Sequence, residues 1–207
     1  MLAGLPFARC YIDDIIIWSS SFAEHLEHLD IVLRRLREWG LKIILGKCLF
    51  GAEEVDFLGH RVIRFGIRPQ LEKTQAIRDM QTPFDLSGLR ALLGLFSYSR
   101  KFVPALSTIA APLNRLLKKD SPWRWGEVEQ AVVDHLKRLL CSDPVQRRPD
   151  YAKPFRLQTD WSVDGVGAVL SQLDERGQEF VVAYASKSSN SAEQNYSSYN
   201  GESLAVV

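Results

Sequence analysis

The chain has 207 residues, 46% of them hydrophobic and 25% charged, which is typical of a globular protein of one or two domains and excludes a largely disordered one. No apolar stretch approaches the roughly eighteen residues of a membrane span, and no signal-peptide pattern opens the chain, so we expect an intracellular protein without a membrane partner. Cys10, Cys48 and Cys141 fit neither a zinc motif nor a disulfide framework.

The net charge of +1 hides an uneven distribution of charge along the chain. Residues 31–119 hold 16 Lys and Arg against 7 Asp and Glu, whereas the remaining residues hold 10 against 18. A basic block that also carries aromatic residues suits binding to a phosphate backbone. Solvated helix faces would give the same count, so composition leaves both interpretations open.

The N-terminal stretch predicts a β-hairpin with two adjacent carboxylates at its tip. The sequence YIDD at 11–14 lies between an apolar run through Phe7 and a β-branched run at 15–17. Asp is disfavoured inside strands, which places the pair at the turn. Carboxylates that project together there bind hard cations through oxygen. An ordinary Asp-rich turn has the same pattern, and the four residues alone do not distinguish the two.

A long amphipathic helix is predicted after the hairpin. Ser21 and Glu24 form a capping box, four leucines recur at helical spacing between 26 and 36, and Gly40 supplies a C-terminal cap. His25 and His28 have the i, i+3 spacing of metal ligands. No third ligand stands nearby, so we interpret them as residues of an exposed helix face.

A small β-rich element is predicted next, with strands at 41–45, 47–50, 55–58 and 60–63. Gly59 separates the last two strands. A glycine within a strand pattern indicates a bulge or a close approach of another backbone.

Helices dominate residues 70–144. The predicted ranges are 71–80, 86–101 behind the cap Asp85, 105–118 with a new start at Pro112, and 127–140 ended by Asp143 and Pro144. The expected buried faces comprise Leu89, Leu92, Leu93 and Phe96 in the second helix and Val128, Val132, Leu136 and Leu139 in the fourth. The cations left for solvent or phosphate are Arg100, Lys101, Arg115, Lys118 and Lys119. Such a module could hold a duplex by its phosphates.

The C-terminal part predicts a sheet followed by a helix. Three strands are expected, the first at 155–159 with its end at Asp160, the second at 166–170 and the third at 180–185. A tight turn through Gly165 and Gly167 would join the first two strands, and a turn at 174–177 would join the last two. The stretch 192–207 predicts a helix that carries Glu202. Taken alone, Asp160 would be a turn residue and Glu202 an exposed helix charge.

The order of these motifs resembles one family, the reverse transcriptase and ribonuclease H region of gypsy-like LTR retrotransposon Pol polyproteins. The resemblance spans essentially the whole chain. It rests on YIDD at 11, EHLEHLDIVLRRLREWGLKI from 24, KCLFGAEEVDFLGHRV from 47, LRALLGLFSYSRKFV from 89, IAAPLNRLLKK from 109, PFRLQTDWSVDGVGAVLSQ from 154 and AEQNYSSYNGESLAVV from 192. Several collinear motifs are more specific than any one of them.

The resemblance implies a multi-domain fragment that combines α+β and α/β parts. Residues 1–69 would form the C-terminal part of the palm with the primer grip, 70–120 a helical thumb, 121–153 a connecting segment, and 154–207 the N-terminal part of a ribonuclease H-like mixed-sheet domain.

The resemblance also implies two centres of two-metal phosphoryl transfer with Mg²⁺ or Mn²⁺. The implied catalytic and metal-binding residues are Asp13 and Asp14 for RNA-directed DNA polymerisation and Asp160 and Glu202 for hydrolysis of RNA in a hybrid. The implied substrate-binding residues are Tyr11 near the primer terminus, Phe57, Leu58, Gly59 and His60 as the primer grip, and Lys47 as a proton donor to pyrophosphate. A solvated lysine explains Lys47 equally well.

The implied partners are an RNA template, a DNA primer, an RNA–DNA hybrid, deoxynucleoside triphosphates and the remainder of the polyprotein, in a cytoplasmic virus-like particle by analogy. The family's further catalytic Asp residues would lie upstream and downstream of this chain, so we expect the isolated chain to be inactive. Trp161 stands where the family usually has Ala, and Asn200 and Gly201 replace residues that favour a helix. The alternative function is a non-catalytic nucleic-acid-binding remnant of a decayed retrotransposon.

Overall fold

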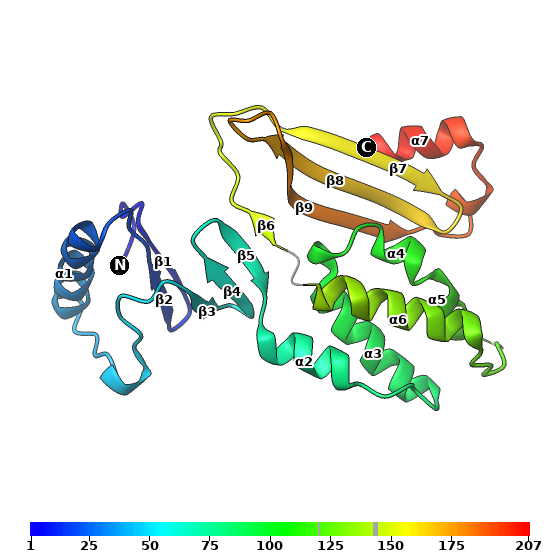
Figure 1. Ribbon diagram of the computed structural model, residues 1–207, viewed down its shortest axis with the longest axis horizontal. Helices are drawn as coiled ribbons and strands as arrows, with labels where there is room; N and C mark the ends of the chain where they lie inside the picture. The colour runs from blue at the N-terminus through cyan, green and yellow to red at the C-terminus, as the bar shows by residue number, and fades with distance from the viewer. Residues whose placement is uncertain (120, 143–144) are drawn as a thin grey trace. The chain divides into compact units, whose positions relative to one another are not determined.

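Figure 1 shows the computed structural model, which describes residues 1–119, 121–142 and 145–207 and divides into two compact units, Met1–Arg64 and Phe65–Val207. Its mixture of helices and several sheets confirms the predicted fold class. Asp143 and Pro144, the predicted helix stop, and residue 120, the predicted end of the thumb, lie outside the described residues. Within the described ranges, no helix is both long and apolar enough to cross a membrane.

The first unit begins with the predicted hairpin, in which β1 (Ala8–Tyr11) pairs antiparallel with β2 (Asp14–Ile17). Helix α1 (Phe22–Glu38) follows and shares a small core with it. That core is made of Ala8 from β1 and Val32 and Leu36 from α1. The amphipathic pattern of α1 therefore buries one line of apolar residues against the hairpin.

Both ends of α1 are closed by the predicted signals. The Ser21 hydroxyl accepts a hydrogen bond from the backbone N–H of Glu24 at 3.2 Å, whereas the Glu24 carboxylate accepts from the N–H of Ser20 rather than of Ser21. At the other end Gly40 has a φ of +67°. The N–H groups of Gly40 and Leu41 donate to earlier carbonyls of the helix at 3.0 and 2.9 Å, which is a Schellman motif.

The prediction of an exposed histidine pair is wrong. The ring of His28 stacks on Phe7 with centroids 3.6 Å apart, and its side chain is only 13% exposed. The hydroxyl of Ser19 lies 2.8 Å from Nδ1 of His28 and 3.2 Å from Nδ1 of His25. Both histidines are therefore half-buried and share the Ser19 hydroxyl, and Nδ1 of His28 also lies 3.2 Å from the carbonyl oxygen of Trp18.

The strands predicted at 41–45 and 47–50 do not form. This segment is irregular apart from a single 3₁₀ turn, η1 (Leu45–Lys47), and its apolar residues Ile44, Leu45 and Leu49 are exposed. A β-branched run becomes a strand only where a neighbouring strand pairs with it, and the structure records no ladder for these residues.

The second hairpin of the first unit is formed by β3 (Val55–Phe57) and β4 (His60–Ile63). Leu58 and Gly59 make a two-residue turn with φ values of +48° and +76°. The pattern is that of a type I′ turn, which favours glycine. Gly59 is therefore a turn residue. Of the two predicted alternatives, a bulge within a strand is wrong, and a close approach of another backbone stays a prediction.

The second unit contains the predicted helices, which surround one apolar core. They are α2 (Leu71–Asp79), α3 (Leu86–Tyr98), α4 (Leu106–Ile109), α5 (Ala111–Leu116) and α6 (Glu127–Cys141), with the 3₁₀ turn η2 (Arg100–Phe102) between α3 and α4. The side chain of Asp85 caps α3 by accepting from the N–H of Gly88 at 2.7 Å. Pro112 lies in the first turn of α5, as expected of a new helix start.

The buried face of α6 differs from the predicted one. Val133, Leu136 and Leu140 are the buried residues, whereas Val128 is 62% exposed. Other apolar residues of α6 flank these three buried ones on both sides. The apolar stripe of the helix is therefore wider than the part of it that packs against the core. Periodicity alone therefore does not locate the centre of the stripe.

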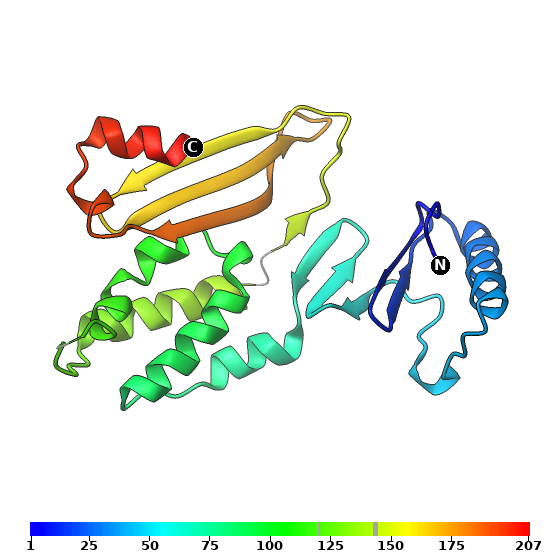
Figure 2. The ribbon, with the colours of Figure 1, turned by 180° about the vertical axis from the view of Figure 1, so that it is seen from behind.

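A sheet with antiparallel order β7, β8, β9 follows (Figure 2), formed by β7 (Arg156–Ser162), β8 (Gly165–Leu173) and β9 (Glu179–Ser188). Each strand is longer than predicted, and the first turn is made by residues 163–164 instead of the two glycines. The predicted terminal helix consists of the 3₁₀ turn η3 (Glu193–Asn195) and α7 (Ser198–Val206), which packs mainly on β7. The short strands β5 (Gly66–Pro69) and β6 (Gln146–Arg147) pair antiparallel.

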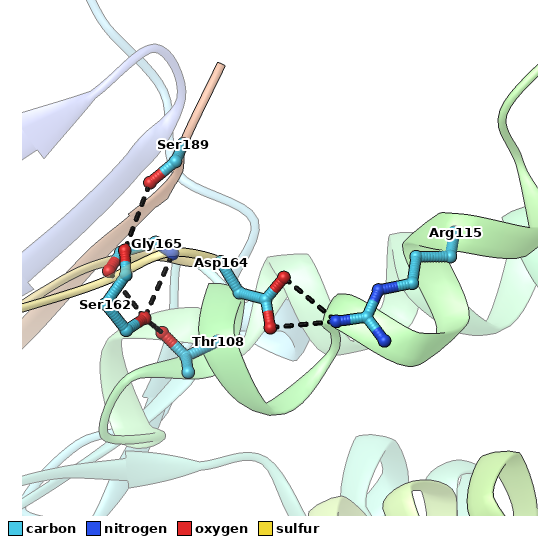
Figure 3. Close-up of polar contacts among 6 residues, drawn as sticks. All are labelled: Thr108, Arg115, Ser162, Asp164, Gly165 and Ser189. Carbon is cyan, nitrogen blue, oxygen red and sulfur yellow. Dashed lines mark hydrogen bonds and ion pairs between the residues drawn. The ribbon is translucent and has the colours of Figure 1, made fainter. Parts of the chain in front are cut away.

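Polar contacts join the helices of this unit to the turn between β7 and β8 (Figure 3). Arg115 of α5 binds the carboxylate of Asp164 at 2.9 and 3.0 Å, and the hydroxyls of Thr108 and Ser162 lie 3.4 Å apart. The close fit depends on Gly165. A Cβ there would lie 2.8 Å from the Ser107 hydroxyl, so the sheet approaches α4 too tightly for a side chain at this position.

Candidate active site

The tip of the first hairpin presents the predicted carboxylates to solvent. Tyr11 and Asp14 form the last cross-strand pair, and Ile12 and Asp13 make the turn. Ile12 has a φ of +55° and Asp13 does not have a positive φ, which is the pattern of a type II′ turn. Tyr11, Ile12, Asp13 and Asp14 are all exposed. The pairing of β1 with β2 thus holds both Asp residues at one apex.

The chemistry of this apex suits a hard divalent cation. Among the described residues, neither Asp13 nor Asp14 takes part in a side-chain hydrogen bond or an ion pair, so their oxygens are available as ligands. Oxygen-only donors fit Mg²⁺ or Mn²⁺. The described part of the chain contains no group of three or more His, Cys, Asp or Glu residues able to hold a metal. An ion here would take its other ligands from water, phosphate or further protein residues.

The residues predicted to form the primer grip lie on the second hairpin of the same unit. Phe57 and His60 form the cross-strand pair that closes its turn, and Leu58 at the tip is exposed. The next cross-strand pair is Asp56 and Arg61, in which the Arg61 guanidinium donates two hydrogen bonds of 2.8 and 3.0 Å to the Asp56 carboxylate. Lys47 is exposed on η1 and not on a strand as predicted.

Asp160 lies inside β7, as the fifth of its seven residues, and not at the strand end as predicted. It pairs with Gly167, so the two share one face of the sheet. A Cβ on Gly167 would lie 3.5 Å from Cβ of Ala105, just before α4, which identifies this face as the one turned toward α4. Asp160 itself is exposed.

Glu202 lies on α7 as predicted, and it is exposed. Side chains alternate along a strand, so Trp161 occupies the face opposite Asp160, and Trp161 is the residue that contacts α7. Asp160 and Glu202 therefore come from adjoining elements on different faces of the sheet. β7 is an outer strand of the described sheet, so one of its edges has no paired strand there.

Two features of α7 and of the segment before it were not predicted. Gly201 is buried directly against the ring of Trp161. Glu193 on η3 accepts hydrogen bonds of 2.8 Å from Nζ of Lys187 and from the N–H of Asn190, and the Lys187 hydrogen bond is the main reason that the pKa of Glu193 lies below its ordinary value. A glycine within a helical stretch was the sequence signal for the first feature. The second had no local signal.

Two family models match the chain. Residues 6–62 match the model described as reverse transcriptase (RNA-dependent DNA polymerase), and residues 125–207 match the model of an RNase H-like domain found in reverse transcriptase. Asp13 and Asp14 fall in the first range and Asp160 in the second, together with Glu202.

Similar proteins include transposon polyproteins of Schizosaccharomyces pombe. Tf2-3 and Tf2-7 are 38% and 37% identical to the chain over 198 residues, which is 96% of the chain and 15% of each relative. The chain thus spans about 15% of the length of these curated relatives.

Similar structures include the foamy viral protease-reverse transcriptase. Its complex with RNA/DNA hybrid matches with a TM-score of 0.83 and 25% identity over 99% of this chain and 28% of that one. Its complex with dsDNA matches with a TM-score of 0.81 and 25% identity over 96% of this chain and 42% of that one.

Proposed function

Because the chain belongs to the reverse transcriptase and ribonuclease H region of LTR retrotransposon Pol polyproteins, we propose that it supplies part of both catalytic centres of such a polyprotein. Residues 1–69 act as the end of the palm with the primer grip, 70–120 as the thumb, 121–153 as the connecting segment and 154–207 as the start of the ribonuclease H-like domain.

At the polymerase centre, Asp13 and Asp14 are the proposed metal ligands. The two carboxylates would hold divalent ions, which would supply charge stabilisation for an in-line phosphoryl transfer. The hairpin holds the two carboxylates at one exposed apex, and Tyr11 beside them offers an aromatic surface to a primer terminus. The absence of competing hydrogen bonds on Asp13 and Asp14 among the described residues is the observation that carries this proposal.

At the ribonuclease centre, Asp160 and Glu202 are the proposed ligands. Two observations support this proposal: both carboxylates are exposed, and α7, which carries Glu202, packs mainly on β7, which carries Asp160. Phe57, Leu58, Gly59 and His60 are the proposed primer grip on their hairpin, and the exposed Lys47 is a candidate proton donor to pyrophosphate.

The proposed substrates are an RNA template, a DNA primer, an RNA–DNA hybrid and deoxynucleoside triphosphates. The similar foamy viral enzyme has been determined in complex with RNA/DNA hybrid and with dsDNA, which supports nucleic-acid duplexes as ligands of this chain. The basic block at 31–119 provides the positive charge that a phosphate backbone requires.

The decisive experiment separates the two centres in a polyprotein that contains this chain. We expect Asp13→Asn to abolish primer extension and leave hybrid cleavage intact, and Glu202→Gln to do the reverse. Asp30→Asn and Glu175→Gln are the matched controls, since both replace exposed carboxylates away from the two centres, and both activities should survive. Loss of both activities in either single variant would contradict the assignment of separate centres.

The isolated 207-residue chain is expected to show neither activity, because each proposed centre holds only two carboxylates of this chain. Primer extension or hybrid cleavage by the purified chain, lost on Asp13→Asn or Glu202→Gln respectively, would refute this expectation.

The second candidate function is nucleic-acid binding without catalysis. Residues 65–119 alone hold 9 Lys and Arg against 3 Asp and Glu, which favours phosphate binding by the helical part of the second unit. Reversal of Arg100, Lys101, Lys118 and Lys119 to Glu should weaken duplex binding and lower the slope of log affinity against log salt by about one per lost phosphate contact. The matched control reverses four exposed arginines outside the block, namely Arg124, Arg138, Arg148 and Arg176. An equal loss in both variants would exclude a specific role for the block.

A further inference from the structure

One contact joins the backbones that carry Asp160 and Glu202. Trp161 follows Asp160 in β7, and Gly201 precedes Glu202 in α7. A Cβ on Gly201 would lie 2.1, 2.4 and 2.6 Å from three ring atoms of Trp161. Non-bonded carbon atoms do not approach each other this closely, so the indole occupies the space that a side chain at position 201 would need.

Taken separately, each residue of this contact is unfavourable. Glycine within a helix costs about 1 kcal/mol relative to alanine. The indole Nε1 of Trp161 is buried and has no hydrogen-bond partner among the described residues, which also costs stability. Together they are complementary, because the missing side chain on the helix makes room for the large one on the strand, and the ring buries its apolar surface against the helix backbone.

We propose that Trp161 and Gly201 form a complementary pair that sets the separation of α7 from β7, and that Trp161 is thereby a positioning residue for Glu202. The metal-related part of this inference rests on the proposed role of Asp160 and Glu202 as ligands. The pair itself is independent of that role, since it follows from the contact alone.

A second attachment of α7 to the sheet explains why the contact with Trp161 fixes the orientation of the helix. The segment before α7 is tied to β9 by Glu193, which binds Lys187 at 2.8 Å, and Ser197 then caps the helix by accepting from the N–H of Asn200 at 3.4 Å. The loop thus holds the start of α7, and the ring of Trp161 supports the helix one turn later. Two supports define the direction of α7, so the position of Glu202 depends on the thickness of the indole.

The pair is tested by a double-mutant cycle on the 207-residue chain, read as the thermal unfolding midpoint. We expect Trp161→Ala and Gly201→Ala each to lower the midpoint, and the double variant to be less destabilised than the sum of the two. Trp161→Phe keeps an aromatic ring and removes the unpartnered N–H, so it should fold even if Trp161→Ala does not. Gly201→Ala should then be less harmful in the Trp161→Phe background. Additive effects in both backgrounds would overturn the pair.

Positioning is tested by Mn²⁺ binding measured by electron paramagnetic resonance, in a background with Asp13→Asn and Asp14→Asn that removes the other candidate site. Binding should be lost in Asp160→Asn and in Glu202→Gln, reduced about tenfold or more in Trp161→Ala, and restored in Trp161→Phe. The control is Trp125→Ala, which removes a half-buried indole that bonds Gln130 in the helical core and should lower stability without changing Mn²⁺ affinity.

Three outcomes of the Mn²⁺ experiment would overturn the positioning role of Trp161, and each outcome has a different meaning. Unchanged Mn²⁺ affinity in Trp161→Ala would show that the contact is packing only. An equal loss of affinity in Trp125→Ala would attribute the effect to general destabilisation. Mn²⁺ binding that is insensitive to Asp160→Asn and Glu202→Gln would overturn the metal site and the positioning role together, while the double-mutant cycle would still decide the pair.

Discussion

Ile12 carries the backbone strain of the proposed polymerase centre. Its φ of +55° is a conformation that β-branched residues rarely adopt, and its side chain is 82% exposed, so no burial of this residue compensates for the strain. The strain is local to the turn that presents Asp13 and Asp14. The pairing of β1 with β2 must therefore hold the turn in place, although Ile12 prefers a negative φ.

Ile12→Asn is expected to stabilise this hairpin by about 1 kcal/mol, because asparagine tolerates positive φ better than isoleucine does. Amide hydrogen exchange should show roughly five-fold greater protection in β1 and β2. Ile44→Asn is the matched control, since Ile44 is also exposed but has a φ of −99°. Similar protection changes in both variants would mean that polarity, and not strain, is the cause.

The C-terminal end of α1 depends on the left-handed conformation of Gly40. A Cβ at Gly40 would meet no neighbouring atom, so any cost of Gly40→Ala comes from its φ of +67° and not from a clash. We expect a loss of about 1 kcal/mol in the free energy of unfolding of the first unit. Denaturant titration measures it. Gly46→Ala, where there is equal space and no positive φ, should change stability by less than about 0.5 kcal/mol, and a matching loss there would refute the strain argument.

The contact between the helices and the sheet of the second unit rests on close packing more than on its ion pair. Arg115 and Asp164 have side chains 60% and 33% exposed, and Asp164→Asn should cost less than about 1 kcal/mol. Gly165→Ala should cost about 1–3 kcal/mol, because its Cβ would lie 2.8 Å from the Ser107 hydroxyl of α4, in addition to 2.7 Å from the carbonyl oxygen of Lys187 within the sheet. Gly94→Ala on α3, with open space, should be neutral or stabilising. Chemical denaturation ranks the three variants, and the reverse order for Asp164 and Gly165 would contradict this account.

Elements with a local signal could be predicted from the sequence. Ser21 and Gly40 define the ends of α1, Asp85 caps α3, and Pro112 starts α5, because each acts on backbone groups within a few residues. The hairpin at YIDD was predicted correctly, with Asp13 in its turn, and Glu202 lies on a helix as predicted. The placement of Asp14 in the turn was wrong, because Asp14 pairs with Tyr11 and is the first residue of β2.

Features that depend on distant partners could not be predicted. The segment at 41–50 has strand propensity but no partner strand, and the buried line of α6 is chosen by the core that it meets. Asp160 lies within β7 because pairing with β8 extends the strand to Ser162. The replacement of a helix-favouring residue by Gly201 is unfavourable in sequence terms. It is explained only by Trp161, forty residues away in the chain.

The two units differ in their balance of positive and negative charge. The first unit holds 8 Lys and Arg against 9 Asp and Glu, and the second holds 18 against 16. The basic block therefore crosses the boundary between the units, and most of its excess positive charge lies in residues 65–119 of the second unit. A nucleic-acid footprint confined to that unit is the expectation that follows from this distribution.

Stability should fall in acid because both units contain carboxylates with lowered pKa values. The pKa of Glu24 is lowered mainly by the N–H of Ser20, that of Asp174 mainly by the N–H of Gln178, and that of Glu193 mainly by Lys187. Folding disfavours protonation of each group. Their contribution is therefore complete above the ordinary values of 4.5 for Glu and 3.8 for Asp, and it is lost as pH falls through and below those values.

The unfolding midpoint is accordingly expected to stay level down to about pH 5 as far as these groups are concerned, and to fall as the pH drops below the ordinary pKa values of Glu and Asp. Glu193→Gln should start from a lower midpoint at neutral pH and show a shallower fall, because it lacks one of the charges that acid removes. Lys187→Gln should also flatten the fall, since it removes the main cause of the lowered pKa of Glu193. Calorimetry across this range tests both variants. An unchanged slope in both would mean that acid unfolding is governed by other carboxylates.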